Sequence, residues 1–222
     1  MSNKDFNIVE GVLIEYTGTD KNVVIPDGVL VIDKFAFPRD ITSVVIPNSV
    51  LAINKYAFSG CKCLKNVDIP DSVTSICESA FKECTGLTSV KFGKGIKKIG
   101  EFAFYKCTNL KEVTIESGKI EEYAFADCTG LEKVVLGCAK IKDSVFGSSK
   151  EGKINELFVR KTVKKIPQSV LLEFENIYFE ADEKKAKSTI KKTKFGGIMQ
   201  DYYNSYLKTE ANIHWGADIS KI

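Results

Sequence analysis

Four of the seven cysteines occupy one position of a repeating pattern, and regularly spaced thiols could bind a metal or form disulfides. They are Cys61, Cys84, Cys107 and Cys128, spaced 23, 23 and 21 residues apart. If successive repeats stack at the strand spacing of ~4.8 Å, neighbouring sulfur atoms are too far apart for an S–S bond of ~2 Å. Cys61-Lys62-Cys63 lacks the second pair of ligands that a zinc site needs. We therefore expect buried, reduced thiols in a ladder, and no metal or other cofactor.

Two further sequence patterns could indicate an enzyme. The glycine-rich run that begins at Gly93 looks like a phosphate loop, but no Lys-Ser/Thr pair follows it. Gly93 and Gly95 align instead with Pro70 and Ser72 one repeat earlier, which predicts a turn. The single histidine, His214, has no acid in an aligned position and no nucleophile motif to serve. The sequence therefore predicts a protein that is not an enzyme.

Composition favours an ordinary folded domain. Hydrophobic residues make up 44% of the 222 residues, charged residues 27%, and the net charge is +3. This balance excludes a disordered chain and gives no support to nucleic-acid binding. No apolar run has the length of a signal peptide or a membrane span. As written, the sequence predicts a cytoplasmic protein, with a secreted or cell-surface protein as the alternative.

The cysteines belong to a repeat that spans most of the chain. Aligned on the last apolar residue of each strand-like segment, the repeats are 20 to 23 residues apart, at Ile25, Ile46, Ile69, Phe92, Ile115, Leu136, Val159 and Phe179. A period of this kind predicts a solenoid, in which each coil buries its apolar side against the next. We expect a right-handed superhelix of about seven coils.

One coil shows what each part should form. Val67 and Ile69 alternate as in a β-strand, which should pair with its neighbours in a parallel sheet along one side. A second short extended piece, Val73 to Ile76, follows. Ala80-Phe81-x-x-Cys84 has the spacing of a helical turn, and the phenylalanine at this position should stack from coil to coil.

The two ends differ from the repeats and should cap them. Residues 1–22 alternate around Glu10-Gly11 as in a β-hairpin, and the repeats occupy residues 23–180. For residues 181–222 we expect a cap containing a charged helix over 181–194, a second helix over 198–207 and a last strand around 211–215.

The motif IPDSVTSI followed by AF-x-x-C-T-x-L resembles the BspA-like, or Treponema pallidum-type, leucine-rich repeats, over roughly residues 8–180. The opening GVLIEYTGTDKNVVIPDGV is also similar to the start of such proteins, and the two strands expected near 176–179 and 211–215 resemble their end. The resemblance implies a protein-binding module. Such repeats are common in surface or secreted adhesion proteins, whose partners vary.

The outward residue of each predicted strand should form one row on the open face of the sheet, here called the central row. Its members are Val24, Val45, Asp68, Lys91, Thr114, Val135, Phe158 and Tyr178. The middle is polar, whereas the last three form an apolar cluster flanked by Lys133, Glu156 and Arg160. Exposed apolar clusters mark partner sites. The alternative is that the C-terminal tyrosine-rich helix covers them.

Lysines form a second row, here called the lysine file, before the second extended piece: Lys97, Lys98, Lys119, Lys140, Lys164 and Lys165. Stacked like charges repel, so we expect Glu101, Glu121 and Asp143 to balance them. Binding of a polyanion to this file is the alternative. The favoured function is a non-catalytic protein-interaction module, with an adhesion protein and then a polyanion-binding solenoid as alternatives.

Overall fold

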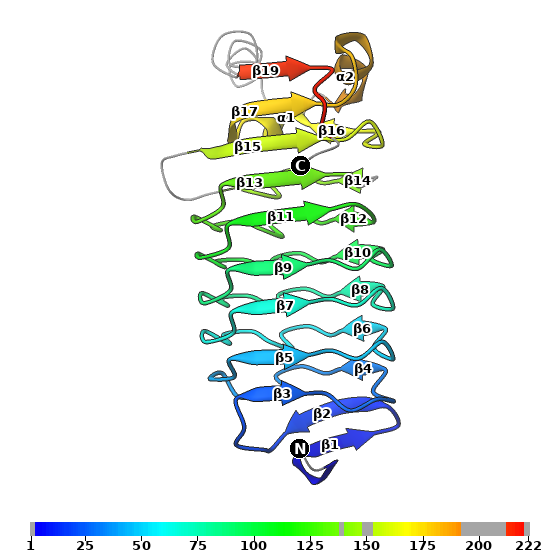
Figure 1. Ribbon diagram of the computed structural model, residues 1–222, viewed down its shortest axis with the longest axis vertical. Helices are drawn as coiled ribbons and strands as arrows, with labels where there is room; N and C mark the ends of the chain where they lie inside the picture. The colour runs from blue at the N-terminus through cyan, green and yellow to red at the C-terminus, as the bar shows by residue number, and fades with distance from the viewer. Residues whose placement is uncertain (1–2, 138–139, 148–152, 192–211, 220–222) are drawn as a thin grey trace.

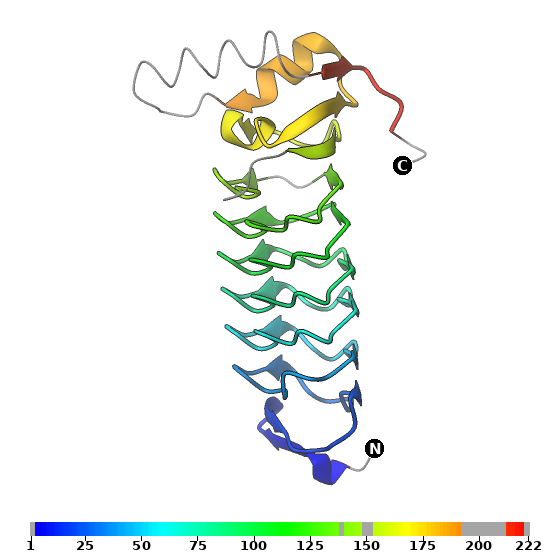
Figure 2. The ribbon, with the colours of Figure 1, turned by 90° about the vertical axis from the view of Figure 1, so that its left-hand side faces the viewer.

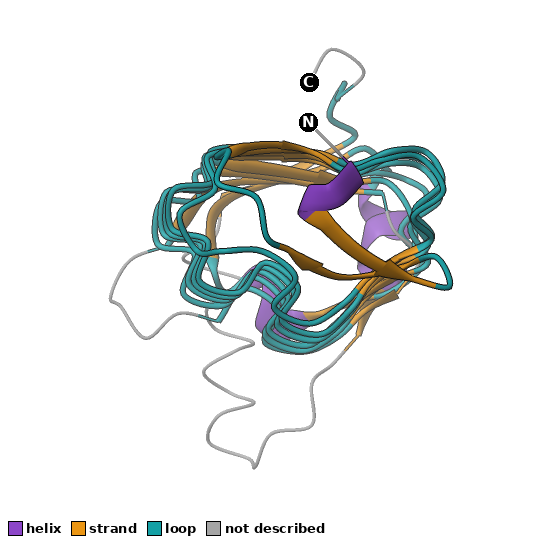
Figure 3. Cartoon of the chain, turned by 90° about the horizontal axis from the view of Figure 1, so that it is seen from below, coloured by secondary structure: helices purple, strands orange, loops and turns teal. Residues whose placement is uncertain are grey.

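The computed structural model describes residues 3–137, 140–147, 153–191 and 212–219, and it is a parallel β-solenoid of about eight turns. This confirms the predicted fold class with one coil more than expected. Figure 1 shows the coils stacked along the long axis, and Figure 3 shows them superposed when seen along that axis, with strands on two sides.

One side carries the longer strands and is here called the long-strand face. Its strands are β3 (Asn22–Val24), β5 (Ser43–Val45), β7 (Asn66–Asp68), β9 (Ser89–Lys91), β11 (Glu112–Ile115), β13 (Lys133–Leu136), β15 (Ile154–Val159), β17 (Phe174–Phe179) and β19 (Asn212–Trp215). β7 to β19 form one parallel sheet, and β3 pairs with β5. This is the parallel sheet that the V-x-I pattern predicts.

The second extended piece of each coil also forms a sheet, which the sequence analysis did not predict. It begins with the hairpin of β1 (Phe6–Val9) and β2 (Val12–Tyr16), which follows the short 3-10 helix η1 (Asn3–Asp5). Two-residue strands continue it in parallel: β4 (Val31–Ile32), β6 (Ala52–Ile53), β8 (Ser75–Ile76), β10 (Lys98–Ile99), β12 (Lys119–Ile120) and β14 (Lys140–Ile141). β16 (Ile166–Pro167) pairs separately with β18 (Ile190–Lys191). Strands of two residues are too short for an alternating pattern to reveal them.

The expected helical turn after the second strand is a chain of tight turns instead. Ser79 and Glu83 adopt left-handed backbone, with φ of 56° and 59°, which prevents an α-helix from forming. Their amide groups, and that of Phe81, donate to carbonyl groups of the next coil, at 2.9, 2.7 and 2.7 Å. The turn region therefore adds a third set of hydrogen bonds between coils.

The core is a column of stacked phenylalanines inside the solenoid. Phe58, Phe81 and Phe104 are fully buried and stack with ring centroids 4.8 and 5.0 Å apart. The column begins at Phe37 and ends at Phe146, which meets Phe174 edge-on. This is the ladder predicted from the Ala-Phe motif, and it keeps consecutive coils in register.

The C-terminal cap contains less helix than expected in the part that the structure describes. After the short helix α1 (Gln168–Leu171), helix α2 (Glu183–Thr189) is capped by Asp182, whose carboxylate accepts from the Lys185 amide at 2.9 Å. It ends before residue 194 because Ile190 is extended and pairs with Ile166. The predicted helix 198–207 lies outside the described residues. Figure 2 shows α2 and β19 at the C-terminal end of the stack.

Candidate functional site

The register of the long strands places the central row in one line. Six neighbouring pairs of the row lie directly opposite each other: Val24 and Val45, Asp68 and Lys91, Thr114 and Val135, Val135 and Phe158, Phe158 and Tyr178, Tyr178 and His214. The sequence analysis therefore assigned the row correctly but omitted its last member, His214. Aligning Trp215 with Phe179 would have found it, because these two residues are also paired.

The C-terminal end of the central row is an aromatic stack. The Phe158 and Tyr178 rings lie 4.7 Å apart at 11°, and the Tyr178 and His214 rings lie 4.6 Å apart at 9°. Parallel strands hold the rings at the inter-strand spacing, so the stack follows from the register. The Lys133 ammonium lies 5.4 Å from the centroid of the Phe158 ring, within cation–π distance.

The row is open in the middle and covered at its apolar end. Asp68, Lys91 and Thr114 are exposed. Val135 and Phe158 are only 2% and 6% exposed, because Ile219 packs on them. Of the two alternatives for this apolar end, the structure shows coverage by the chain itself. The covering residue, Ile219, follows β19, and the predicted tyrosine-rich helix lies outside the described residues.

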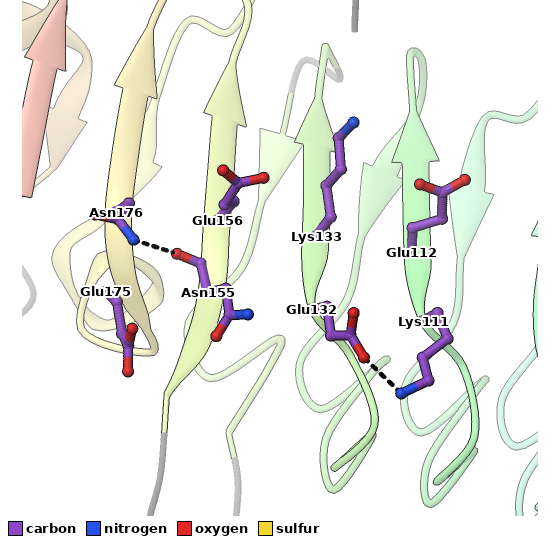
Figure 4. A pocket seen from close by; sticks show the side chains of 8 residues that line it. All are labelled: Lys111, Glu112, Glu132, Lys133, Asn155, Glu156, Glu175 and Asn176. Atoms are coloured by element: carbon purple, nitrogen blue, oxygen red, sulfur yellow. Dashed lines mark hydrogen bonds and ion pairs between the residues drawn. The ribbon is translucent and has the colours of Figure 1, made fainter.

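A second row flanks the central row on the same face, two residues before the central-row residue of each strand. In its C-terminal half, Glu112, Lys133, Glu156 and Asn176 lie opposite one another in turn. With the residues that precede them, they line a pocket of about 560 Å³. Figure 4 shows the Lys111–Glu132 ion pair. It also shows the side-chain amide of Asn176, which donates to the backbone carbonyl of Asn155 at 3.1 Å. The pocket offers charges of both signs.

Arg160 forms an ion pair with Glu116 of the same chain. Its Nε donates to Glu116 Oε1 at 2.9 Å, although 44 residues separate the two. Gly137 lies in the coil between these two residues. If another residue replaced this glycine, its Cβ atom would come within 2.3 Å of the Glu116 carboxylate. A second pocket of about 300 Å³ lies beside this ion pair, lined by Lys91, Thr114 and Glu116 among others.

The positive charge of the lysine file is partly offset at its centre. Lys98 and Lys119 lie side by side in β10 and β12, and both contact Glu121 Oε1, at 3.6 and 2.6 Å. Burial raises the pKa of Glu121, but the hydrogen bond from Lys119 and the charges of Lys119, Lys98 and Lys142 outweigh it, so the pKa is lowered. Asp143 accepts from Ser169 at 2.9 Å. Glu121 is therefore the partner that the sequence analysis expected for the middle of the file.

The four repeated cysteines are free thiols inside the solenoid. Cys84, Cys107 and Cys128 donate to the carbonyl oxygens of phenylalanines in the preceding coil, at 3.0, 3.2 and 3.1 Å. Burial raises the pKa of Cys61 to about 12 and raises that of Cys84 further. Within the described residues, no group of three or more His, Cys, Asp or Glu side chains could hold a metal ion. Cys138 lies outside those residues.

The chain belongs to the BspA-type leucine-rich repeat family. Six copies of that repeat region match it, over residues 15–132 and 52–179. Leucine-rich repeat proteins of this kind are typically protein-interaction modules rather than known enzymes. No curated protein matches the chain. No helix in the described part of the chain is long and apolar enough to cross a membrane.

Solved structures show the same fold. The leucine-rich repeat protein of T. pallidum is 25% identical, with a TM-score of 0.56 over 72% of this chain and 86% of that one. A Bacteroides ovatus leucine-rich repeat protein is 21% identical, with a TM-score of 0.50 over 86% of this chain and 66% of that one. The pneumococcal vaccine antigen PcpA is 15% identical, with a TM-score of 0.53 over 97% of this chain and 49% of that one. The chain thus spans about half the length of PcpA.

Proposed function

We propose that the chain is a non-catalytic protein-interaction module that binds its partner on the long-strand face. The observation that carries the proposal is the central row, in which outward side chains from the seven-stranded parallel sheet, continued by the paired strands β3 and β5, follow the stack of coils. Repeat proteins use extended surfaces of this kind to contact other proteins. The phenylalanine column and the inter-coil hydrogen bonds fix the spacing of that line before a partner arrives.

The chemistry of the face favours a partner with alternating charges. Asp68 and Lys91 lie opposite each other in the open middle of the row. The flanking row then presents Glu112, Lys133 and Glu156 in sequence. Alternation of sign along the face selects a partner with the complementary order and rejects a uniformly charged one.

Adhesion to a host or matrix protein would use the same face. Binding of a polyanion would instead use the lysine file, but Glu121 pairs with two of its lysines and offsets part of their charge. A polyanion-binding function predicts affinity that falls steeply with salt, whereas a protein partner recognised on the long-strand face does not require it. Measuring capture at two salt concentrations separates these functions.

Site-specific photo-cross-linking tests the proposal. A photoreactive residue replaces Thr114, exposed in the middle of the central row, and in a control replaces Thr74 beside the two-residue strands. Thr74 lies outside the long strands, directly before β8, where its amide donates to the Leu51 carbonyl of the previous coil. We expect one protein to be cross-linked from position 114 and not from position 74. Equal cross-linking from both positions, or none from 114, would overturn the proposal.

A further inference from the structure

A small apolar cluster lies outside the solenoid, on the long-strand face. Val135, Phe158 and Ile219 form it, and Tyr178 and Ala217 pack against its edge. It is separate from the main core, which lies inside the coils. Three of these residues belong to the central row, so the cluster occupies part of the face that we propose for partner binding.

The segment that completes the cluster returns over the sheet from its C-terminal edge. After β19, Gly216 turns the chain with a φ of +68°. The Gly216 and Ala217 amides donate to the carbonyl groups of Ala181 and Phe179, both at 2.9 Å. Figures 1 and 2 show the segment running back along the face of the sheet.

Ile219 is the most deeply buried side chain of this segment. Gly216 and Asp218 are exposed and Ala217 is partly buried, whereas Ile219 is 1% exposed. Fixing four residues costs conformational entropy, and the burial of Ile219 together with two backbone hydrogen bonds offsets part of that cost. A segment held in this way can exchange with another segment that presents the same anchor.

The surroundings of Ile219 define what the position accepts. Val135 and Phe158 supply an aliphatic and an aromatic wall, and the Phe158–Tyr178 stack extends the apolar surface toward β19. Lys133 lies at the edge, over the Phe158 ring. A branched aliphatic side chain fits this environment, whereas a carboxylate would lose its hydration there.

We propose that this end of the central row is a binding site for an extended segment of the partner protein with an isoleucine or valine anchor, and that residues 216–219 occupy the site in the free protein. The proposal rests on the function proposed above and names the chemistry of the partner. Because residues 216–219 are tethered, their effective concentration is high, so a partner must bring further contacts. The open middle of the row, at Asp68, Lys91 and Thr114, can supply them.

The test uses the full chain and a synthetic peptide with the sequence GADISKI, residues 216–222. In an Ile219→Gly variant the site is vacant, and we expect the peptide to shift the methyl resonances of Val135 saturably. A peptide with Asp in place of the isoleucine should leave them unchanged. Wild-type protein should require at least ~10-fold more peptide, because the tethered segment competes. Thermal melting checks that Ile219→Gly still folds.

Two results would overturn the proposal. One is the absence of a saturable shift at Val135 in the folded Ile219→Gly variant, and the other is equal peptide affinity in the variant and the wild type. The Ile219→Gly variant could also form a dimer without peptide. If that dimer shows the same shifts of the Val135 resonances, the site binds a second copy of this chain. If the inference fails while cross-linking from Thr114 persists, the proposed function stands without it. Loss of cross-linking from Thr114 with an intact peptide effect would reject the proposed function alone.

Discussion

The thiol of Cys84 donates a hydrogen bond of 3.0 Å to the carbonyl oxygen of Phe58 in the preceding coil. Cys107 and Cys128 repeat this contact with Phe81 and Phe104. The cysteine at this position therefore does more than fill apolar space. Its thiol also donates a hydrogen bond to a backbone carbonyl group inside the core. The contact also joins the cysteine ladder to the phenylalanine column, which explains why both residues recur in one motif.

The buried thiols should be unreactive in the folded protein. Burial raises the pKa of Cys61 to about 12, and raises the pKa values of Cys84 and Cys107 as well. Thiolate is the reactive form, so a thiol reagent at pH 8 should label exposed Cys63 and leave these three unmodified until the protein is unfolded. Mass spectrometry of labelled peptides identifies the modified positions. Rapid native labelling of Cys84 would contradict the ladder.

Phe81→Ala should destabilise the protein strongly. The side chain is fully buried between Phe58 and Phe104, and its loss removes two stacking contacts and leaves a cavity. We expect a loss of ~3–5 kcal/mol in the free energy of unfolding, measured by denaturant titration. Phe35→Ala is the control, since Phe35 is 56% exposed, and it should cost less than about 1 kcal/mol.

Gly95→Ala should also destabilise the fold, because the glycine-rich run serves coil packing. A Cβ at position 95 would come within 1.9 Å of the Asp71 carbonyl oxygen in the previous coil. We expect a cost of at least ~2 kcal/mol, with a lower melting temperature. At Gly147 the nearest atom would be 3.4 Å away, so Gly147→Ala should change stability by less than about 0.5 kcal/mol. Equal melting temperatures for the two variants would reject this explanation.

Glu173 should make stability fall as the pH rises. Burial raises the pKa of this carboxyl to about 7, although the charge of Lys153 opposes the shift. The folded protein therefore holds the proton more strongly than the unfolded chain between about pH 4.5 and 7, and stability decreases across that window. Because Glu173 is partly exposed, the loss should be on the order of 1 kcal/mol.

Glu173→Gln should remove this dependence and be more stable than wild type at pH 8. The matched control is Glu175→Gln, two residues further on and exposed. In this variant the free energy of unfolding should fall with pH as it does in the wild type. Chemical denaturation at pH 5 and pH 8 gives the change in the free energy of unfolding for each variant. A wild-type slope in Glu173→Gln would show that another group is responsible.

The repeat made much of the fold predictable. The spacing of the Ala-Phe-x-x-Cys motif was enough to predict the phenylalanine column and the buried thiols, because residues at one position of a solenoid share one environment. The same alignment placed Asp68, Lys91 and Thr114 on one face, which agrees with the pairing of Asp68 with Lys91 and of Ser89 with Glu112, two residues before Lys91 and Thr114. Predictions were most accurate where one pattern recurs many times.

Features without a recognisable pattern in the sequence were not predictable. Ile219 lies in a segment without a repeat, so no alignment points to its contact with Val135. The Arg160–Glu116 ion pair joins residues 44 positions apart, and only the stacking of coils brings them together. Left-handed backbone at Ser79 and Glu83 has no sequence signature, because glycine is the residue expected there. These features depend on three-dimensional packing and not on local pattern.

The affinity of the cross-linked partner for two matched variants tests the central claim most directly. Thr114→Arg places a bulky charge in the open middle of the central row, and Thr74→Arg places the same change beside the short strands. We predict that Thr114→Arg raises the Kd at least ~10-fold, the effect of a disrupted contact at the centre of an interface, while Thr74→Arg binds as wild type does. Both variants should melt like the wild type. Unchanged binding by Thr114→Arg, or equal loss in the two variants, would contradict partner binding on the long-strand face.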